Sequence, residues 1–223
     1  MWRKTNLVVM IDLVFVSNAH DEERKHITEG AIITARMDDL VNKIIVVEQQ
    51  PEVNYGAFVT TLHYDFPFNY NRCMNLGIEY TEASHIAMCN NDLEFSFNWA
   101  RNLIENMGDC LSASPYSPNV HDRWWKNAES DPVGYAVRSM ISGWCIVIHR
   151  SVLDKIGKLN EGVKFWYSDC LYAKQIEKAG IKHKLVRSSI VKHLESKTLF
   201  GHPDIDELTG GQKENYEKAI KVI

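Results

Sequence analysis

Short apolar runs alternate with helical patterns through the first ninety residues, and this alternation restricts the fold more than any other feature of the sequence. From the β-branched content and the helical spacing we expect strands at 7–16, 43–49, 56–64 and 84–90, and helices at 22–37 and 69–80. Strands separated by helices pair in parallel through crossover connections. The pattern therefore predicts an α/β fold with a mostly parallel central sheet flanked by helices.

The second half of the chain is less regular. Helices are expected at 96–107, 167–180 and 212–223, and strand-like runs at 135–150 and 182–193. Residues 112–134 carry three of the six prolines, which predicts a long loop. Because no linker-like segment interrupts the 223 residues, we expect one domain with two lobes.

Composition narrows the class of partner and the compartment. The net charge is −4, whereas general polyanion-binding proteins usually carry a basic stripe. The five cysteines are odd in number and scattered, which disfavours a disulfide framework and favours a reducing, cytoplasmic compartment. Asp12 interrupts the N-terminal apolar run, so we expect a first strand there and not a signal peptide. No apolar stretch approaches the roughly 20 residues that span a bilayer, which predicts a soluble protein without a membrane span.

Polar side chains follow three of the expected strands at the point where each strand ends. They are Ser17, Asn18, Glu48, Asn90, Asn91 and Asp92. Ligands of open α/β sheets bind outside the carboxyl ends of the strands, so these residues predict a polar ligand across the sheet edge. A buried carboxylate at Asp92 needs compensation, either from water in a solvated loop or from a divalent metal ion.

The helix expected at 69–80 adds a candidate anion site. Asn71 and Asn75 lie four residues apart and share the face opposite the apolar stripe. Both lie in the first turns, where free backbone N–H groups and the helix dipole favour anions, and Arg72 brings a positive charge. This pattern suits a phosphate-bearing ligand, and it suits a solvated amphipathic helix equally well.

Four segments of the chain form an ordered set: FNYNRCMNLGIEYTEASHIAMCNNDLEF, GWCIVIHRSVLDKIGKLNEGVKFWYSDCLYAKQIEKAG, IVKHLESKT and ENYEKAIK. In this order they resemble family 2 glycosyltransferases with the GT-A fold. The first resembles the family's Asn- and Gly-containing helix and the apolar strand that ends in a DxD-like element. The second resembles a Gly-containing strand, a short helix ending at Gly, and an acidic motif that opens a helix. The last two resemble the late His-containing element and the terminal helix. No single motif is specific, but the ordered set is.

The resemblance implies a nucleotide-sugar donor and a divalent metal, Mn²⁺ or Mg²⁺. Glu48 matches the acidic residue that contacts the base or ribose of the donor, and Asn90 replaces the first Asp of the DxD-like element. Asp92 matches the metal-binding Asp of that element, and Glu94 is a less favoured ligand. His193 matches a His that often completes the metal shell, and an imidazole favours Mn²⁺. The other residues expected on the donor side are Ser17, Asn18, Asn71, Arg72, Asn75 and Asn91.

On the acceptor side, the resemblance implies that Asp169 is the catalytic base of an inverting displacement. The family usually has Glu-Asp where this chain has Ser168 and Asp169. The alternative is that Ser168 caps the helix while Asp169 interacts with the dipole of its first turn. Gly143, Trp144 and Trp166 are expected on the same side. Aromatic faces stack on sugars and nucleobases, and tryptophans also fill cores.

Together these features predict a metal-dependent hexosyl- or pentosyltransferase of one GT-A-like domain. Its parts are a nucleotide-sugar-binding half at 1–95, an acceptor-side half at 96–195, and a tail with a helix at 196–223. The acceptor is expected to be a glycan or another hydroxyl-bearing molecule. Arg123 and Lys126 flank two tryptophans in the expected loop, and an anionic glycan or a nucleic acid could use them.

Two alternatives remain. The first is a non-catalytic module that binds a nucleotide or a glycan, since Asn90 and Ser168 replace acidic residues of the family pattern. The second is a nucleotidyltransferase, which usually needs a Gly-rich, basic phosphate loop after the first strand. The segment VSNAHDEERK offers no such loop.

Overall fold

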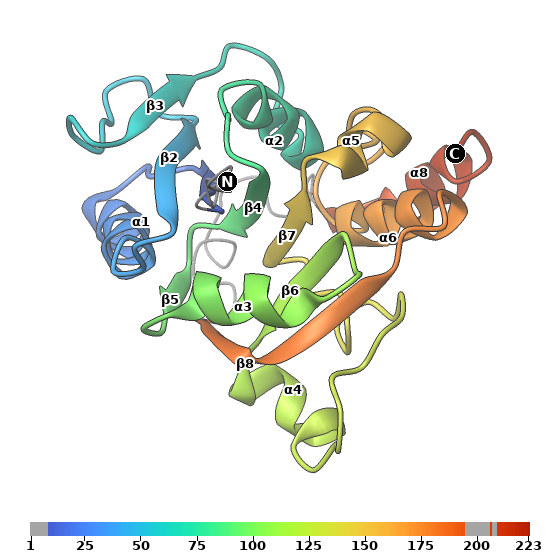
Figure 1. The fold of residues 1–223 in the computed structure, drawn as a ribbon. Helices are drawn as coiled ribbons and strands as arrows, with labels where there is room; N and C mark the ends of the chain where they lie inside the picture. Colours follow the sequence, from blue (N-terminus) through green and yellow to red (C-terminus); the bar gives the residue numbers. More distant parts are fainter. Residues whose placement is uncertain (1–8, 195–205, 207–208) are drawn as a thin grey trace, which may run out of the picture.

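The computed structural model describes residues 9–194, 206 and 209–223, and its centre is an eight-stranded sheet (Figure 1). The strands are β1 (Ile11–Ser17), β2 (Val41–Glu48), β3 (Thr60–His63), β4 (His85–Asn90), β5 (Leu93–Phe95), β6 (Ser112–Tyr116), β7 (Cys145–His149) and β8 (His183–His193). The helices are α1 (Glu22–Ala35), α2 (Tyr70–Ile78), α3 (Trp99–Met107), α4 (Pro118–Trp125), α5 (Ser151–Ile156), α6 (Ser168–Lys178) and α8 (Gln212–Ala219).

Parts of three expected segments lie outside the described residues: 7–8 of the first strand, 195–198 of IVKHLESKT, and 196–205 with 207–208 of the expected tail. No helix within the described ranges is long and apolar enough to cross a membrane.

The strand pairing confirms the parallel sheet expected for the first half. The spatial order is β3-β2-β1-β4-β7-β6-β8-β5. β1 pairs in parallel with β2 and β4, and β2 pairs in parallel with β3. β7 is antiparallel to β4 and β6, β6 is parallel to β8, and β5 is antiparallel to β8. The carboxyl ends of β1, β2, β4 and β8 therefore lie at one edge, which brings Asn90 and His193 to the same side of the sheet.

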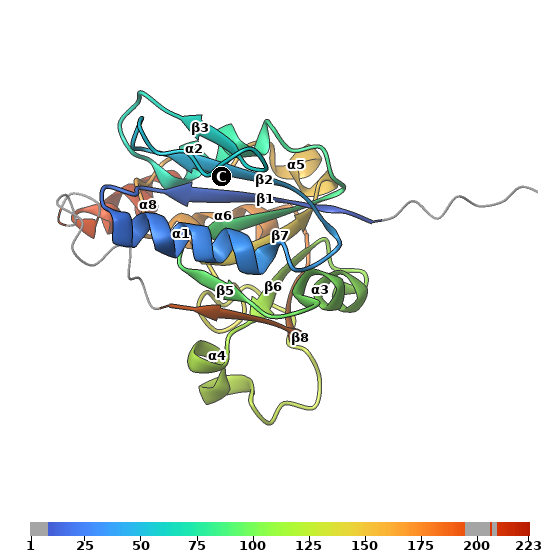
Figure 2. The ribbon, with the colours of Figure 1, turned by 90° about the vertical axis from the view of Figure 1, so that its left-hand side faces the viewer.

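β1 is buried on both faces, which explains its uninterrupted apolar run. Leu13 and Phe15 pack with α1 and α3 on one face, whereas Val14 and Val16 pack with α2, α5 and α6 on the other. Figure 2 shows α1 running alongside β1. On the opposite face α2 approaches β1 closely at Gly77, where an added Cβ would come within 2.3 Å of Val14 Cγ1.

The prediction of a long loop at 112–134 is wrong, because this segment contains β6 and α4. Pro115 lies in β6 next to a register shift in its pairing with β8, an irregularity at which a strand tolerates proline. Pro118 is the first residue of α4, where the missing N–H removes no helical hydrogen bond. The strand-like run expected at 135–150 is shorter in the structure, since only Cys145–His149 of it forms a strand, β7.

The Asp12 carboxylate ties together the starts of three strands. Asp12 is fully buried. Its Oδ1 accepts hydrogen bonds from Asn42 Nδ2 at 2.9 Å and from the Lys43 backbone N–H at 3.1 Å. Its Oδ2 accepts from the backbone N–H groups of Glu82 and Ala83, at 2.6 and 2.8 Å, just before β4. The charge that interrupts the N-terminal apolar run is therefore compensated by four donors from β2 and the approach to β4.

Replacing Asp12 with Asn should lower the free energy of unfolding by about 3 kcal/mol, since an amide presents an N–H group to donors that need an acceptor. Urea denaturation followed by circular dichroism measures this change. Asp154→Asn is the matched control at an exposed position of α5, and it should stay within about 0.5 kcal/mol of the wild type. Equal stability of the two variants would contradict the role assigned to Asp12.

Candidate functional site

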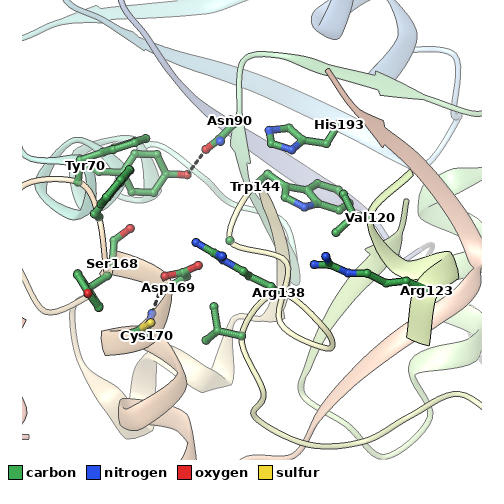
Figure 3. Close-up of a pocket in the computed structure, with 15 residues that line it drawn as sticks. Tyr70, Asn90, Val120, Arg123, Arg138, Trp144, Ser168, Asp169, Cys170 and His193 are labelled. Carbon is green, nitrogen blue, oxygen red and sulfur yellow. Dashed lines mark hydrogen bonds between the residues drawn. The ribbon is translucent and has the colours of Figure 1, made fainter. Parts of the chain in front are cut away.

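A pocket of about 480 Å³ opens where the carboxyl ends of β4 and β8 meet the start of α6 (Figure 3). Its lining residues come from widely separated parts of the sequence: Tyr70, Asn90, Val120, Arg123, Val137, Arg138, Gly143, Trp144, Phe165, Trp166, Tyr167, Ser168, Asp169, Cys170 and His193. Those that the sequence analysis singled out for the site are Asn90, Gly143, Trp144, Trp166, Asp169 and His193.

Consecutive residues at the end of β4 have different partners. Asn90 Oδ1 accepts a hydrogen bond from the Tyr70 hydroxyl at 3.0 Å (Figure 3). Asn91 instead donates from Nδ2 to Thr28 Oγ1 at 2.9 Å and to Ser17 Oγ at 3.3 Å, outside the pocket. Because the Asn90 oxygen is engaged by Tyr70, its NH₂ group is the part of the amide left to donate to a ligand in the pocket.

Asp92 is fully buried, yet neither of its carboxylate oxygens has a hydrogen-bond partner among the described residues. The Nε2 atom of His193 is also buried without such a partner and lies 3.4 Å from Asp92 Oδ1. Trp144 stacks on the His193 ring, with 5.6 Å between the centroids and 11° between the planes, and so orients the imidazole. An uncompensated buried carboxylate costs several kcal/mol. A carboxylate oxygen beside an imidazole nitrogen fits Mn²⁺ or Mg²⁺, which would supply that compensation.

The described residues bring no third His, Cys, Asp or Glu to this pair. Glu94, the less favoured metal ligand, is exposed and lies 3.5 Å from Lys192 Nζ. Its two neighbours in β5 are buried, so the alternation of the strand turns Glu94 toward solvent. Water and the oxygens of a bound molecule are further ligands that such an ion accepts.

Asp169 lies in the first turn of α6 with its carboxylate directed into the pocket (Figure 3). Burial raises the pKa of this carboxyl group, against smaller lowering effects of the Cys170 backbone N–H, which donates to Oδ1 at 2.8 Å, and of the Arg138 charge. Gly143 leaves room for it, because a Cβ there would come within 2.6 Å of Asp169 Oδ2. A carboxylate with a raised pKa at the wall of a pocket suits the acceptance of a proton from a ligand.

Two residues with left-handed backbone line the pocket. Tyr167, at φ 71°, holds the N-cap position of α6, and Arg138, at φ 72°, lies in the segment before β7. The alternative that Ser168 caps α6 is wrong, because Ser168 is already the first residue of the helix. This backbone region costs a non-glycine residue about 1–2 kcal/mol, and such strain is concentrated at functional sites.

A second polar group lies at the ends of β1 and β2. The predicted donor-side residues within it are Ser17, Asn18, Glu48 and Asn91. Glu48 is fully buried; its Oε1 accepts from the backbone N–H groups of Ala19 and Gln50, at 3.0 and 2.8 Å, and its Oε2 accepts from the Tyr55 hydroxyl at 2.7 Å. The Gln50 side chain donates to Asn18 Oδ1 at 2.7 Å, and the Tyr55 hydroxyl lies 3.0 Å from Ser17 Oγ. The strand ends bring these residues together, and their contact with a donor stays a prediction.

Asn71 and Asn75 do not form the exposed polar face expected for α2, since both are buried. Asn75 Nδ2 donates to the Leu159 carbonyl at 3.0 Å, and its Oδ1 accepts from the Leu159 N–H at 2.9 Å. Asn71 Nδ2 donates to the Asn160 carbonyl at 2.7 Å. Arg72 places its guanidinium 4.0 Å from the centroid of the Phe66 ring. The two amides thus hold the segment between α5 and α6, and a phosphate contact by these residues stays a prediction.

Sequence reasoning missed three residues that shape the pocket: Tyr70, His121 and Arg138. Tyr70 and Arg138 line it, and the His121 ring centroid lies 6.0 Å from that of Trp144. No local spacing identifies them. His121 lies on α4, in the segment whose prolines predict a loop, and Arg138 reaches the pocket through a backbone conformation that its residue type does not favour.

His121 is fully buried and neutral near pH 7. The Ser117 backbone N–H donates to Nδ1 at 2.9 Å, so the ring proton lies on Nε2, which is 3.1 Å from Ser142 Oγ. Burial lowers the pKa of His121 to about 4. This histidine therefore connects α4 to the segment before β7 as a neutral hydrogen-bonding group.

No protein-family model matches the sequence, and no curated protein matches it. Solved structures do share the fold. The crystal structure of GalNAc-T7 with UDP, GalNAc and Mn²⁺ aligns with a TM-score of 0.69 at 12% identity, over 96% of this chain and 48% of that chain. The mannosyltransferase PcManGT from Pyrobaculum calidifontis, in complex with GDP-Man and Mn²⁺, aligns with a TM-score of 0.64 at 10% identity, over 84% of this chain and 57% of that chain.

These alignments confirm the expected fold class: the chain has the GT-A fold of nucleotide-sugar glycosyltransferases. It spans about half the length of the first of these structures and somewhat more of the second. At such low identity the likeness concerns the fold.

His121 should make the protein less stable in mild acid. The unfolded chain binds a proton to this histidine near pH 6.5, whereas the folded chain resists it until about pH 4, so the free energy of unfolding falls as the pH drops through this window. Between pH 7 and pH 5 the loss from His121 alone should be about 2 kcal/mol. Urea denaturation at both pH values, on wild type and His121→Gln, measures it.

The exposed His26 offers the matched control. His26→Gln should lose stability between pH 7 and pH 5 as the wild type does, whereas His121→Gln should lose about 2 kcal/mol less. If all three proteins lose the same amount, the buried imidazole is not the origin of the pH dependence.

Proposed function

We propose that the protein is a metal-dependent glycosyltransferase that moves a sugar from a nucleotide-diphosphate sugar to an acceptor hydroxyl. The observation that carries the proposal is the buried pair of Asp92 and His193, whose facing atoms have no hydrogen-bond partner among the described residues; His193 lines a pocket that also holds the Asp169 carboxylate. The GT-A fold supports it, because two proteins with this fold were crystallised with a nucleotide or a nucleotide sugar and Mn²⁺.

On the donor side, Asp92 and His193 would hold Mn²⁺ or Mg²⁺. When bound, the ion neutralises the negative charge that develops on the leaving diphosphate. The Asn90 NH₂ group, oriented by Tyr70, donates to an oxygen of the donor in the pocket. Glu48 acts through the chain around it: both its oxygens hold neighbouring groups, so it shapes the ends of β1 and β2 against which the nucleoside lies.

On the acceptor side, Asp169 takes the proton of the attacking hydroxyl. The hydroxyl oxygen forms a bond to the anomeric carbon as the bond from that carbon to the diphosphate oxygen breaks, and the proton passes to the carboxylate. One base and one face of attack give an inverting single displacement. The raised pKa of the Asp169 carboxyl group increases its affinity for this proton.

Replacing Asp92 with Asn should abolish the Mn²⁺-dependent binding of a nucleoside diphosphate. Calorimetric titration of UDP, GDP, ADP and CDP, with and without Mn²⁺, identifies the base that the wild type prefers. The variant should bind that nucleotide about 100-fold more weakly in Mn²⁺, because the charged ligand is lost. Its metal-free stability should equal or exceed that of the wild type, since an uncompensated buried charge has been removed.

Glu94→Gln is the matched control, since it removes a carboxylate two residues away that faces solvent. It should bind the nucleotide as the wild type does. Wild-type affinity in Asp92→Asn would exclude Asp92 as a metal ligand.

Replacing Asp169 with Asn should lower kcat about 10²–10⁴-fold and leave nucleotide binding unchanged, because the amide keeps the shape of the carboxylate and cannot accept the proton. Steady-state transfer to a panel of hydroxyl acceptors measures this, with Asp154→Asn as the control for a carboxylate outside the site. Nucleotide binding by the wild type without transfer to any acceptor would instead favour a non-catalytic binding module.

A further inference from the structure

We propose that the acceptor carries a carboxylate or a phosphate, and that Arg138 and Arg123 bind this group while the reacting hydroxyl lies at Asp169. The inference rests on the proposed function and adds the chemical class of the acceptor. Its basis is a pair of guanidinium groups that line the pocket and make no ion pair with the described residues.

The side chain of Arg138 is directed into the pocket by an unfavourable backbone conformation. Its backbone is left-handed, and its N–H donates to the Ile141 carbonyl at 2.9 Å, so a tight turn presents the side chain. In Figure 3 the guanidinium extends toward the Asp169 carboxylate. No carboxylate of the described residues comes within ion-pair distance, 4.0 Å, of this guanidinium. A residue with left-handed backbone whose guanidinium lines a pocket without an ion pair among the described residues suggests a ligand of opposite charge.

Arg123 adds a second positive charge from α4. Its guanidinium lies 3.6 Å from the centroid of the neighbouring Trp124 ring, which limits its rotation. The other charges of this region neutralise each other, since Lys126 Nζ is 3.5 Å from Asp122 Oδ2. The pocket is thus lined by two arginines and one aspartate, on a chain whose net charge is −4. A site for a neutral acceptor has no need of this concentration of positive charge.

The position of the arginines assigns them to the acceptor and not to the donor diphosphate. The candidate metal ligands are Asp92 and His193, and the Trp144 ring covers His193. In Figure 3 the Trp144 ring lies between His193 and the two arginines, and Arg138 is on the same side as Asp169. The anion they bind is therefore near the proton acceptor. Planar guanidinium groups match carboxylates and phosphates through paired hydrogen bonds, and the exposed Trp166 offers an aromatic face to a sugar ring.

Ligand-detected NMR on the full chain, saturated with diamagnetic Mg²⁺ and the preferred nucleoside diphosphate, tests the proposal. The probes are glucuronic acid, glucose 6-phosphate and methyl glucoside. The wild type should bind at least one anionic probe about tenfold more tightly than methyl glucoside. Preference for glucuronic acid identifies a carboxylate acceptor, and preference for glucose 6-phosphate a phosphorylated one.

Arg138→Gln and Arg123→Gln should remove this preference while the binding of the nucleoside diphosphate stays at the wild-type level. Arg138→Lys keeps the positive charge but loses the planar guanidinium that forms paired hydrogen bonds. This variant should therefore retain part of the preference for the anionic probe. Lys155→Gln, at an exposed position of α5 outside the pocket, is the matched control and should bind all probes as the wild type does. Equal binding of charged and neutral probes, or no binding of the charged ones, overturns the proposal. So does a loss of nucleotide affinity in the arginine variants, which would assign the two arginines to the diphosphate.

Failure of the proposed function appears separately, as absence of Mn²⁺-dependent nucleotide binding by the wild type.

Discussion

The turn between β4 and β5 is the constraint on which the candidate site depends, because consecutive polar side chains leave it in different directions. Asn90 bonds to Tyr70 in the pocket, Asn91 bonds to the group at the end of β1, and Asp92 lies against His193. A regular strand would send neighbouring side chains to only two faces. Through one short stretch of backbone, the turn therefore reaches the pocket at Tyr70, the polar group at the end of β1, and His193.

Several residues of the site have a burial or a backbone conformation that is unfavourable for the stability of the fold. Asp92 is buried, and its carboxylate has no hydrogen-bond partner among the described residues. Asp169 packs closely against Gly143, and Arg138 and Tyr167 have left-handed backbone. Elsewhere a buried charge is compensated, as the four donors around Asp12 illustrate. The contrast between Asp12 and Asp92 is informative, because both are fully buried carboxylates and, within the described part of the chain, only Asp12 has hydrogen-bond donors. Proteins retain such local conflicts where a ligand resolves them.

Much of the fold was predictable because it depends on residue types that act locally. The apolar runs of β1, β2 and β4 form the expected parallel strands, since burial on both faces demands continuous apolar sequence. The errors came from residues whose effect depends on position. Pro115 and Pro118 predicted a loop, yet one lies at a strand irregularity and the other at a helix start. The amides of Asn71 and Asn75 predicted a polar surface, yet they satisfy the backbone of a segment more than 80 residues away.

The sequence by itself determined the fold class, the polar ends of the strands and the order of the segments. The reason is that apolar periodicity and turn chemistry depend on residues that are close together in the sequence. The resemblance to a glycosyltransferase family, and not the residue pattern alone, implied roles for Asp92, Asp169 and His193. Only the tertiary structure decided that Asp92 and His193 lie together, with buried atoms that no other described residue bonds to, and that Asp169 faces the pocket that His193 lines. It alone brought Arg138 and Arg123 there. Burial, strain and unsatisfied hydrogen bonding are properties of the space around a residue, and that space exists only once distant segments have packed together.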